Sequence, residues 1–299
     1  MSNRKIGIDL GGTKIEIAVL DERNHTVLRR RIATPAGDYD AIVSAIAGLV
    51  REAESQLGPA DGIGIGTPGM ASVETGLMKN ANSTALIGKA LQRDVEERLQ
   101  RSVRMTNDAN CFALSESVDG AGAGAHTVFA VILGTGVGGG IAIGGRILEG
   151  PNRIAGEWGH NPLPWPRERE TPGPACYCGK HGCIETFLSG PALAREYRAA
   201  SGSAAEPAEI ASRAVQGDAV ALACMETYED RVARALATVI NILDPDAIVL
   251  GGGVSNIGRL YERLPAILPA YVFSDSVRTR IIRAAHGDSS GVRGAAMLA

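Results

Sequence analysis

The sequence has few cysteines for its length, and this scarcity limits the class of protein. Five cysteines among 299 residues argue against a disulfide-stabilised fold, so a cytoplasmic location is expected. No apolar run reaches the length of a transmembrane helix, and no apolar targeting segment precedes a first strand expected to begin by Lys5. No repeat with a period of about 20–50 residues is present, which excludes a solenoid.

The sequence also lacks a strong excess of charge of either sign. It has 30 Lys and Arg residues against 33 Asp and Glu residues, a formal net charge of −3 at pH 7. This balance gives no overall attraction to nucleic acid or to an anionic membrane, and neither is expected as a partner. With 45% hydrophobic residues the chain can bury a large core, and its length favours two domains.

Two glycine-rich turns, far apart in the chain, carry the main functional signal. Their residues are Asp9, Gly11, Gly12, Thr13 and Lys14 in the first turn, and Gly134, Thr135 and Gly136 in the second. Each turn lies between two short aliphatic runs, which predicts a hairpin whose turn leaves backbone N–H groups free for a phosphate. A third glycine patch, Gly251, Gly252 and Gly253, follows a strand-like run. Together they predict a nucleotide held between two lobes.

Neither turn fits the commoner phosphate-binding motifs. A P-loop pattern is absent, and although residues 134–139 satisfy G-x-G-x-x-G, the glycine-rich residues 140–145 are poorly suited to begin the helix of a dinucleotide-binding fold. Flexible hairpins without a ligand would account for one such turn but poorly for both.

The remaining pattern predicts an α/β chain with two lobes. Strands are expected over 6–10, 15–20, 27–32, 62–66, 103–106 and 128–133, and helices over 38–56, 91–99, 109–118, 190–200, 207–216, 218–243 and 290–298. The Gly and Ala residues of 120–124 suggest a hinge. The predicted domains are therefore 1–120, which the helix 290–298 could complete, and 121–289.

Three thiols lie within eight residues, at Cys176, Cys178 and Cys183, in a glycine-containing loop. In a cytoplasmic protein this spacing favours a zinc site over a disulfide, and a redox role is the alternative. Spacing does not settle the fourth ligand. His181 lies inside the loop, where chelation beside two of the cysteines would be cramped, so His160 is favoured.

Three carboxylates are candidates for chemistry. Asp108 lies where a strand gives way to a helix, and the carboxyl ends of strands in open α/β sheets are where ligands bind. An ordinary helix N-cap is the alternative for Asp108. Glu157 and Glu185 flank the cysteine loop, and a shared metal would draw both toward one cavity. The alternative for each is a surface ion.

Taken together, these motifs resemble one family along essentially the whole chain. They are the segments 6–14, 66–69, 107–110, 134–136, 156–160, 176–183, 251–253 and 294–296, in this order. The chain is similar to ROK proteins (repressors, open reading frames, sugar kinases), within the superfamily of actin, hexokinase and Hsp70-like ATPases. Residues 80–84, 158–165 and 286–291 resemble the bacterial fructokinases (mannofructokinases) of that family.

The resemblance implies a two-lobed ATPase fold with a ligand cleft between the lobes, and an ATP-dependent kinase that converts D-fructose to fructose 6-phosphate. It implies Asp108 as general base. It implies a structural Zn²⁺ on His160, Cys176, Cys178 and Cys183, and sugar contacts from Asn107, Asp108, Glu157, His160 and Glu185. The glycine segments, with Lys14, would hold ATP, and Asp9 would lie near Mg²⁺. A homodimer is also expected.

Three alternatives remain beside the fructokinase interpretation. A sugar-responsive repressor of the family would carry an N-terminal helix-turn-helix, for which the four residues before the first expected strand leave no room. A non-catalytic sugar sensor would not need Asp108 and both phosphate turns. A kinase for glucose, mannose or an N-acetylated amino sugar differs only in pocket residues that the sequence does not place.

Overall fold

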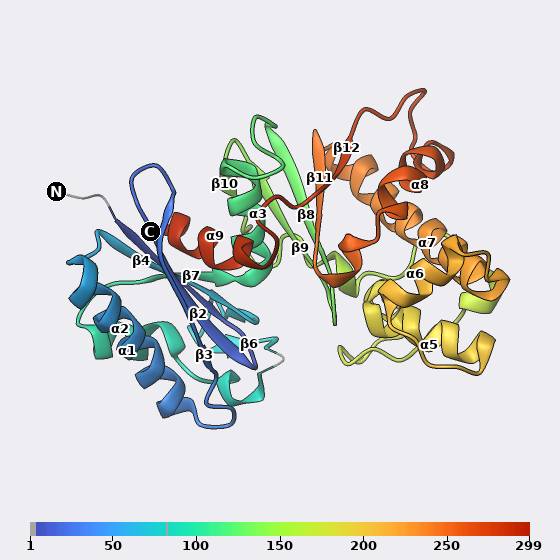
Figure 1. Cartoon of the computed structure of the whole chain (residues 1–299). Coiled ribbons are helices and arrows are strands. Elements are labelled where there is room, and N and C mark those ends of the chain that lie inside the picture. The colour runs from blue at the N-terminus through green and yellow to red at the C-terminus, as the bar shows by residue number, and fades with distance from the viewer. Residues whose placement is uncertain (1–3, 82) are drawn as a thin grey trace. The chain divides into compact units, whose positions relative to one another are not determined.

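The computed structural model describes residues 4–81 and 83–299. These residues form two compact units, each built on its own mixed sheet (Figure 1). The first unit comprises the described residues up to Val118, then Ile147–Ala155 and Asp288–Ala299, and the second comprises Asp119–Arg146 and Gly156–Gly287. The predicted α/β class is confirmed. Among the described residues, none of the helices has both the length and the apolar content to span a bilayer.

The first unit has a five-stranded sheet with the order β3-β2-β1-β4-β7. Its strands are β1 (Lys5–Leu10), β2 (Lys14–Leu20), β3 (Thr26–Ala33), β4 (Gly62–Thr67) and β7 (Arg104–Asn107). The hairpin β1–β2 and the pair β2–β3 are antiparallel, whereas β1, β4 and β7 are parallel. The carboxyl ends of these three parallel strands therefore meet at one edge of the sheet.

Four helices complete the first unit: α1 (Tyr39–Leu57), α2 (Leu91–Leu99), α3 (Asp108–Val118) and α9 (Ser290–Leu298). The predicted C-terminal helix α9 contacts β1, β4 and α3, and its Ser290 hydroxyl donates a 2.7 Å hydrogen bond to the buried carboxylate of Glu116. Residues 147–155 were expected in the second domain but group here. One reason is that Thr106 donates to Glu149 at 3.2 Å.

The second unit repeats the same strand pattern in the sheet β10-β9-β8-β11-β12. Its strands are β8 (Thr127–Leu133), β9 (Val137–Ile143), β10 (Arg146–Ile147), β11 (Ala247–Gly251) and β12 (Arg280–Arg283). Its helices are α4 (Glu185–Leu188), α5 (Gly190–Ser201), α6 (Pro207–Val215), α7 (Ala219–Leu243) and α8 (Arg259–Ile267). Strands β8 and β9 are antiparallel, and β8, β11 and β12 are parallel.

Sequence patterning missed the less regular elements. Helix α8 contains Pro265, which breaks the usual helical signal, and β12 is a four-residue edge strand with an arginine at each end. The two-residue strands β5 (Met70–Ala71), β6 (Met78–Lys79) and β10 are too short for any periodicity.

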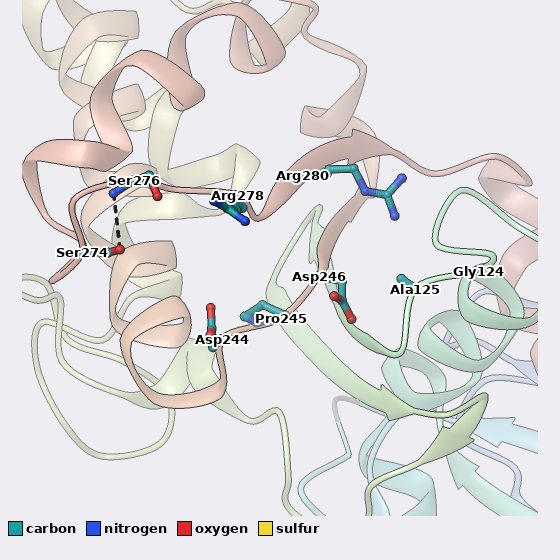
Figure 2. A pocket seen from close by; sticks show the side chains of 9 residues that line it. All are labelled: Gly124, Ala125, Asp244, Pro245, Asp246, Ser274, Ser276, Arg278 and Arg280. Carbon is teal, nitrogen blue, oxygen red and sulfur yellow. Dashed lines mark hydrogen bonds between the residues drawn. The ribbon is translucent and has the colours of Figure 1, made fainter.

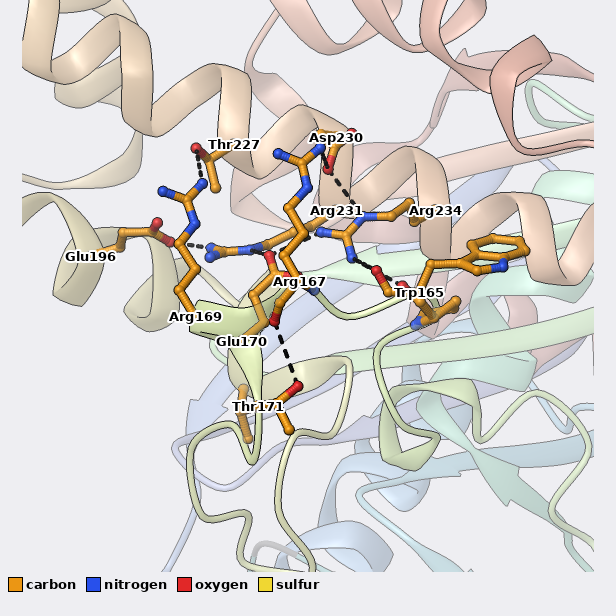
Figure 3. Close-up of polar contacts among 12 residues, drawn as sticks. Trp165, Arg167, Arg169, Glu170, Thr171, Glu196, Thr227, Asp230, Arg231 and Arg234 are labelled. Atoms are coloured by element: carbon orange, nitrogen blue, oxygen red, sulfur yellow. Dashed lines mark hydrogen bonds and ion pairs between the residues drawn. The ribbon is translucent and has the colours of Figure 1, made fainter.

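A buried ion cluster fixes the proline-rich segment 162–174 against α7 (Figure 3). Glu170 is 3% exposed and accepts hydrogen bonds from Arg231 at 2.7 Å and from Arg234 at 2.9 Å. Arg234 also donates to the carbonyl groups of Pro164 and Trp165, at 2.9 and 2.8 Å. Trp165 has a φ of 44°, a strained value for a bulky residue, which these contacts hold in place.

The charges of the cluster depend on one another. Burial by itself would raise the pKa of Glu170, but hydrogen bonds from Arg234, Arg231 and the backbone N–H of Arg167 outweigh burial and lower that pKa to about 2. A depressed carboxyl pKa contributes stability above the unfolded-state pKa. That contribution is lost as the pH falls from about 4.5 toward 2.

Glu170→Gln should lower the free energy of unfolding by about 2–3 kcal/mol, because it removes the carboxylate that two buried arginines share and leaves Arg231 only its pair with Glu196 and Arg234 only its pair with Asp230. The matched control is Glu209→Gln, which removes one partner of an exposed i,i+4 pair with Arg213 and should cost less than about 1 kcal/mol. Urea unfolding at pH 7 and at pH 3 would measure the free energy of unfolding of both variants and of the unsubstituted protein. A Glu170→Gln variant as stable as the control at pH 7 would contradict the role of the cluster.

Candidate active site

The carboxyl edge of the first unit's sheet carries its predicted polar residues. Asp9 lies near the end of β1, opposite Glu16 of β2 and beside Gly291 of α9. Burial and the charge of Glu16 raise the pKa of Asp9 to about 6, against the weaker opposing effect of Lys14. Glu16 is itself buried and paired with Arg29 and Arg31. A carboxylate so placed fits a role beside a cation.

The structure separates the two roles considered for the start of α3. Asn107 is the capping residue, because its side-chain oxygen accepts the N–H of Asn110 at 2.8 Å. Asp108 is exposed, and its carboxylate accepts the neighbouring N–H of Ala109 at 2.8 Å. The cap proposed as the alternative role of Asp108 is therefore filled by Asn107, while Asp108 presents a carboxylate at the carboxyl end of β7.

The first glycine turn is a well-formed hairpin turn. Gly11 N–H donates to the carbonyl of Lys14 at 2.9 Å, and the Thr34 hydroxyl donates to the carbonyl of Gly11 at 2.7 Å. Gly12 and Thr13 are exposed at its tip. The turn that the sequence predicts is thus present and open to solvent.

The second glycine turn lies where several segments of the second unit converge. Gly134 N–H donates to the carbonyl of Gly136 at 3.0 Å, and Thr135 is exposed. Gly190, the first residue of α5, donates its N–H to the carbonyl of Gly134 at 2.8 Å. The glycine patch after β11 also lies here: a Cβ on Gly252 would be 2.4 Å from the carbonyl oxygen of Leu133.

Trp158 ties the predicted sugar-contact segment to the same hairpin. Its indole N–H donates to the carbonyl of Gly138 at 3.0 Å, and its ring packs edge-on against Phe129, with centroids 5.5 Å apart. Glu157 and His160 lie on either side of this buried tryptophan. In the sequence Trp158 is recognisable only as part of the segment 158–165, and its anchoring role is visible only in the structure.

Four predicted metal ligands meet in the second unit. One ligand atom from each of His160, Cys176, Cys178 and Cys183 lies within 4.8 Å of all the others. His160 Nδ1 is 3.5 Å from Cys176 Sγ, and Cys178 Sγ is 3.6 Å from Cys183 Sγ. Three sulfurs and one imidazole nitrogen form a donor set typical of structural zinc. The geometry therefore fits zinc with His160 as fourth ligand, and the cluster does not include His181.

The thiols of the cluster differ in their pKa values. Burial raises the pKa of the Cys183 thiol to about 12, while a backbone hydrogen bond from Lys180 lowers that of Cys178. A bound zinc ion would deprotonate its thiol ligands. His160 Nε2 is 3.0 Å from the Tyr177 hydroxyl, so the ring can bind a metal through Nδ1 while its other nitrogen is held.

A cavity of 530 Å³ in the second unit lies away from these residues (Figure 2). It borders the amino ends of β8, β11 and β12, whereas the glycine turn and patch lie at the carboxyl ends of β8 and β11. Its charged lining residues are Asp244, Asp246, Arg278 and Arg280. No residue of the predicted site lines it.

Comparison with known proteins agrees with the motifs. The ROK family model matches residues 5–299. The chain belongs to the ROK family. It is 40% identical over 296 residues to an N-acetyl-D-glucosamine kinase of Pectobacterium atrosepticum, covering 98% of this chain and 97% of the relative. It is 42% identical over the same length to an N-acetyl-D-glucosamine kinase of Shigella flexneri serotype 5b, covering 98% of each.

Solved structures of ROK proteins share the fold. A ROK hexokinase from Thermus thermophilus has a TM-score of 0.87 and 32% identity, covering 99% of this chain and 97% of that one. A ROK glucokinase from Streptomyces griseus, solved with glucose and AMPPNP, has a TM-score of 0.79 and 32% identity, covering 99% of each. The expected hexokinase-like fold class is confirmed.

The fructokinase expectation is not supported by these comparisons. The curated relatives named above are N-acetyl-D-glucosamine kinases, which favours the amino-sugar alternative. The segments that suggested fructose adjoin the motifs by which the chain resembles the family, and residues flanking such motifs do not fix a sugar pocket. One residue of the segment 80–84, Asn82, lies outside the described residues, so the structure does not test its contribution to that resemblance.

The metal cluster generates a direct prediction. Elemental analysis of purified protein should find one zinc ion per chain. Cys183→Ser should lose the metal because a hard hydroxyl replaces a soft thiolate, whereas His181→Ala should retain it. Loss of metal from His181→Ala with retention in His160→Ala would reverse the ligand assignment.

Proposed function

We propose that the protein is an ATP-dependent sugar kinase that phosphorylates N-acetyl-D-glucosamine. The observation that carries the proposal is 40–42% identity over 98% of the chain to N-acetyl-D-glucosamine kinases. The glycine turns and Asp108, at strand ends where α/β sheets bind ligands, support a phosphoryl-transfer chemistry. The expected homodimer and cytoplasmic location stay predictions.

Asp108 is the proposed general base. Its carboxylate is exposed at the amino end of α3, where a sugar hydroxyl could reach it, and it would accept the hydroxyl proton as the oxygen attacks the γ-phosphorus of ATP. Asn107 is buried and its side-chain oxygen is engaged in capping. We therefore assign Asn107 a sugar contact only through its amide nitrogen.

The proposed nucleotide contacts are the two glycine turns, Lys14 and the patch 251–253. Mg²⁺, when bound with ATP, neutralises phosphate charge and prefers oxygen ligands. Asp9 would lie close to it. Because the pKa of Asp9 is about 6, this carboxylate carries its charge at neutral pH and loses it in mildly acidic solution.

Glu157, His160 and Glu185 are the proposed sugar contacts of the second unit, and for His160 a sugar hydroxyl would have to replace the Tyr177 hydroxyl at Nε2. They lie on segments that the metal cluster and Trp158 hold, since His160 is a cluster residue and Glu185 follows Cys183 by two positions. Zinc bound there would have a structural role. It would fix the segments that present these side chains, with no part in the proton transfer.

Asp108→Asn should reduce kcat by about 10²–10⁴-fold, the usual contribution of a general base, because the amide keeps the shape but cannot take up the proton. Sugar affinity should change far less. Asp61→Asn is a suitable control, since Asp61 caps the N–H of Arg4 away from this edge. A coupled ADP-release assay gives the comparison, and an Asp108→Asn enzyme with more than about a tenth of normal turnover would refute the assignment.

Initial rates at subsaturating sugar with MgATP test the substrate. N-acetyl-D-glucosamine should exceed glucose, mannose and fructose in kcat/KM by about tenfold or more, because a site that hydrogen-bonds the acetamido group leaves its own polar groups unpaired with a plain hexose. Fructose as best substrate would restore the fructokinase interpretation. Absence of turnover with all of these sugars would instead favour a non-catalytic sugar sensor.

A further inference from the structure

Glu185 is predicted as a sugar contact, but its carboxylate has a second contact that this role does not use. Its oxygen Oε2 accepts the backbone N–H of Val137 at 2.9 Å. Val137 is the first residue of β9, directly after the second glycine turn. The N–H of Val137, next to the predicted phosphate-binding residues 134–136, is therefore already hydrogen-bonded within the protein.

The space beside the turn is also occupied by Glu185. A Cβ placed on Gly136 would lie 2.7 Å from Glu185 Oε2, closer than a real Cβ contact allows. An alanine at this position would therefore collide with the end of the Glu185 side chain and displace its carboxylate.

The backbone on both sides of Glu185 is fixed independently of its side chain. Ile184 N–H donates to the carbonyl of Asn161 at 2.9 Å, and Gly190 N–H donates to the carbonyl of Gly134 at 2.8 Å. Cys183, in the metal cluster, precedes Ile184. The carboxylate therefore extends from a backbone segment held at both ends, and its hydrogen bond with Val137 N–H links that segment to the turn.

We propose that Glu185 is a positioning residue for the second phosphate turn as well as a sugar contact. One carboxylate oxygen holds Val137 N–H and shapes the turn at Gly136, while Oε1 serves the sugar. This inference rests on the proposed function, and it makes one side chain responsible for the geometry of both substrates. Shortening the Glu185 side chain should then weaken nucleotide binding, and removing its charge should weaken sugar binding.

Two substitutions of Glu185 separate these roles. Glu185→Asp keeps the charge but is one methylene shorter, so it should lose Val137 N–H and raise the Kd for AMPPNP by about tenfold, as for loss of a hydrogen bond to a charged group. Glu185→Gln keeps the length and an acceptor oxygen, so the AMPPNP Kd should stay within about threefold while the KM for the sugar rises. Calorimetry of AMPPNP binding without sugar would give the Kd, and steady-state kinetics would give the KM for the sugar.

A double-mutant cycle tests the contact with Gly136. Gly136→Ala should raise the AMPPNP Kd in the wild-type background, because its methyl group collides with Glu185. In the Glu185→Asp background, where the carboxylate is withdrawn, the same substitution should cost much less. An equal cost in both backgrounds would mean that the methyl group obstructs the phosphate itself, and would overturn the proposal.

Hydrogen exchange of the Val137 amide supplies a readout that requires neither nucleotide nor sugar. Exchange should accelerate in Glu185→Asp and stay close to wild type in Glu185→Gln, with zinc content and melting temperature as controls for folding. If no sugar is phosphorylated, the proposed function fails while this measurement still decides the anchor. Unchanged Val137 exchange in Glu185→Asp would refute the anchor whatever the kinase activity.

Discussion

Four ligand atoms from the segment between residues 156 and 190 meet within 4.8 Å of one another. This segment contains two short 3-10 turns, a dense set of prolines and only a four-residue helix before α5, so regular hydrogen bonding contributes little to its shape. A closed zinc site would supply the missing constraint, because metal binding to such a cluster is itself folding free energy. The ion cluster around Glu170 fixes the proline-rich residues 162–174 of the same segment against α7.

This constraint reaches the hairpin β8–β9 through side chains on either side of the cluster. Trp158 donates to Gly138 ahead of the metal residues, and Glu185 accepts from Val137 after them. Both contacts fall on the strand that leaves the second glycine turn. In the proposed kinase, the groups that recognise sugar and the turn that holds phosphate therefore belong to one packed assembly.

Local patterns in the sequence were sufficient for the regular elements. Both glycine hairpins, the capped helices α1 and α7, and the strand-to-helix change at Asp108 follow from periodicity and capping chemistry, and they are confirmed. The buried pairing of Glu170 with Arg231 and Arg234 could not be predicted, because it joins a loop to a helix about sixty residues later. The anchor of Glu185 on Val137 was missed for the same reason: nothing local marks a carboxylate that caps a distant turn.

In the proposed kinase, the metal cluster holds the residues that contact the sugar. Removing zinc with a chelator and restoring it, with calorimetry of sugar binding at each stage, would test this dependence. Sugar affinity should fall by about tenfold or more when the metal is removed and return when zinc is added back. Metal-free protein that stays folded and binds the sugar with full affinity would contradict this dependence.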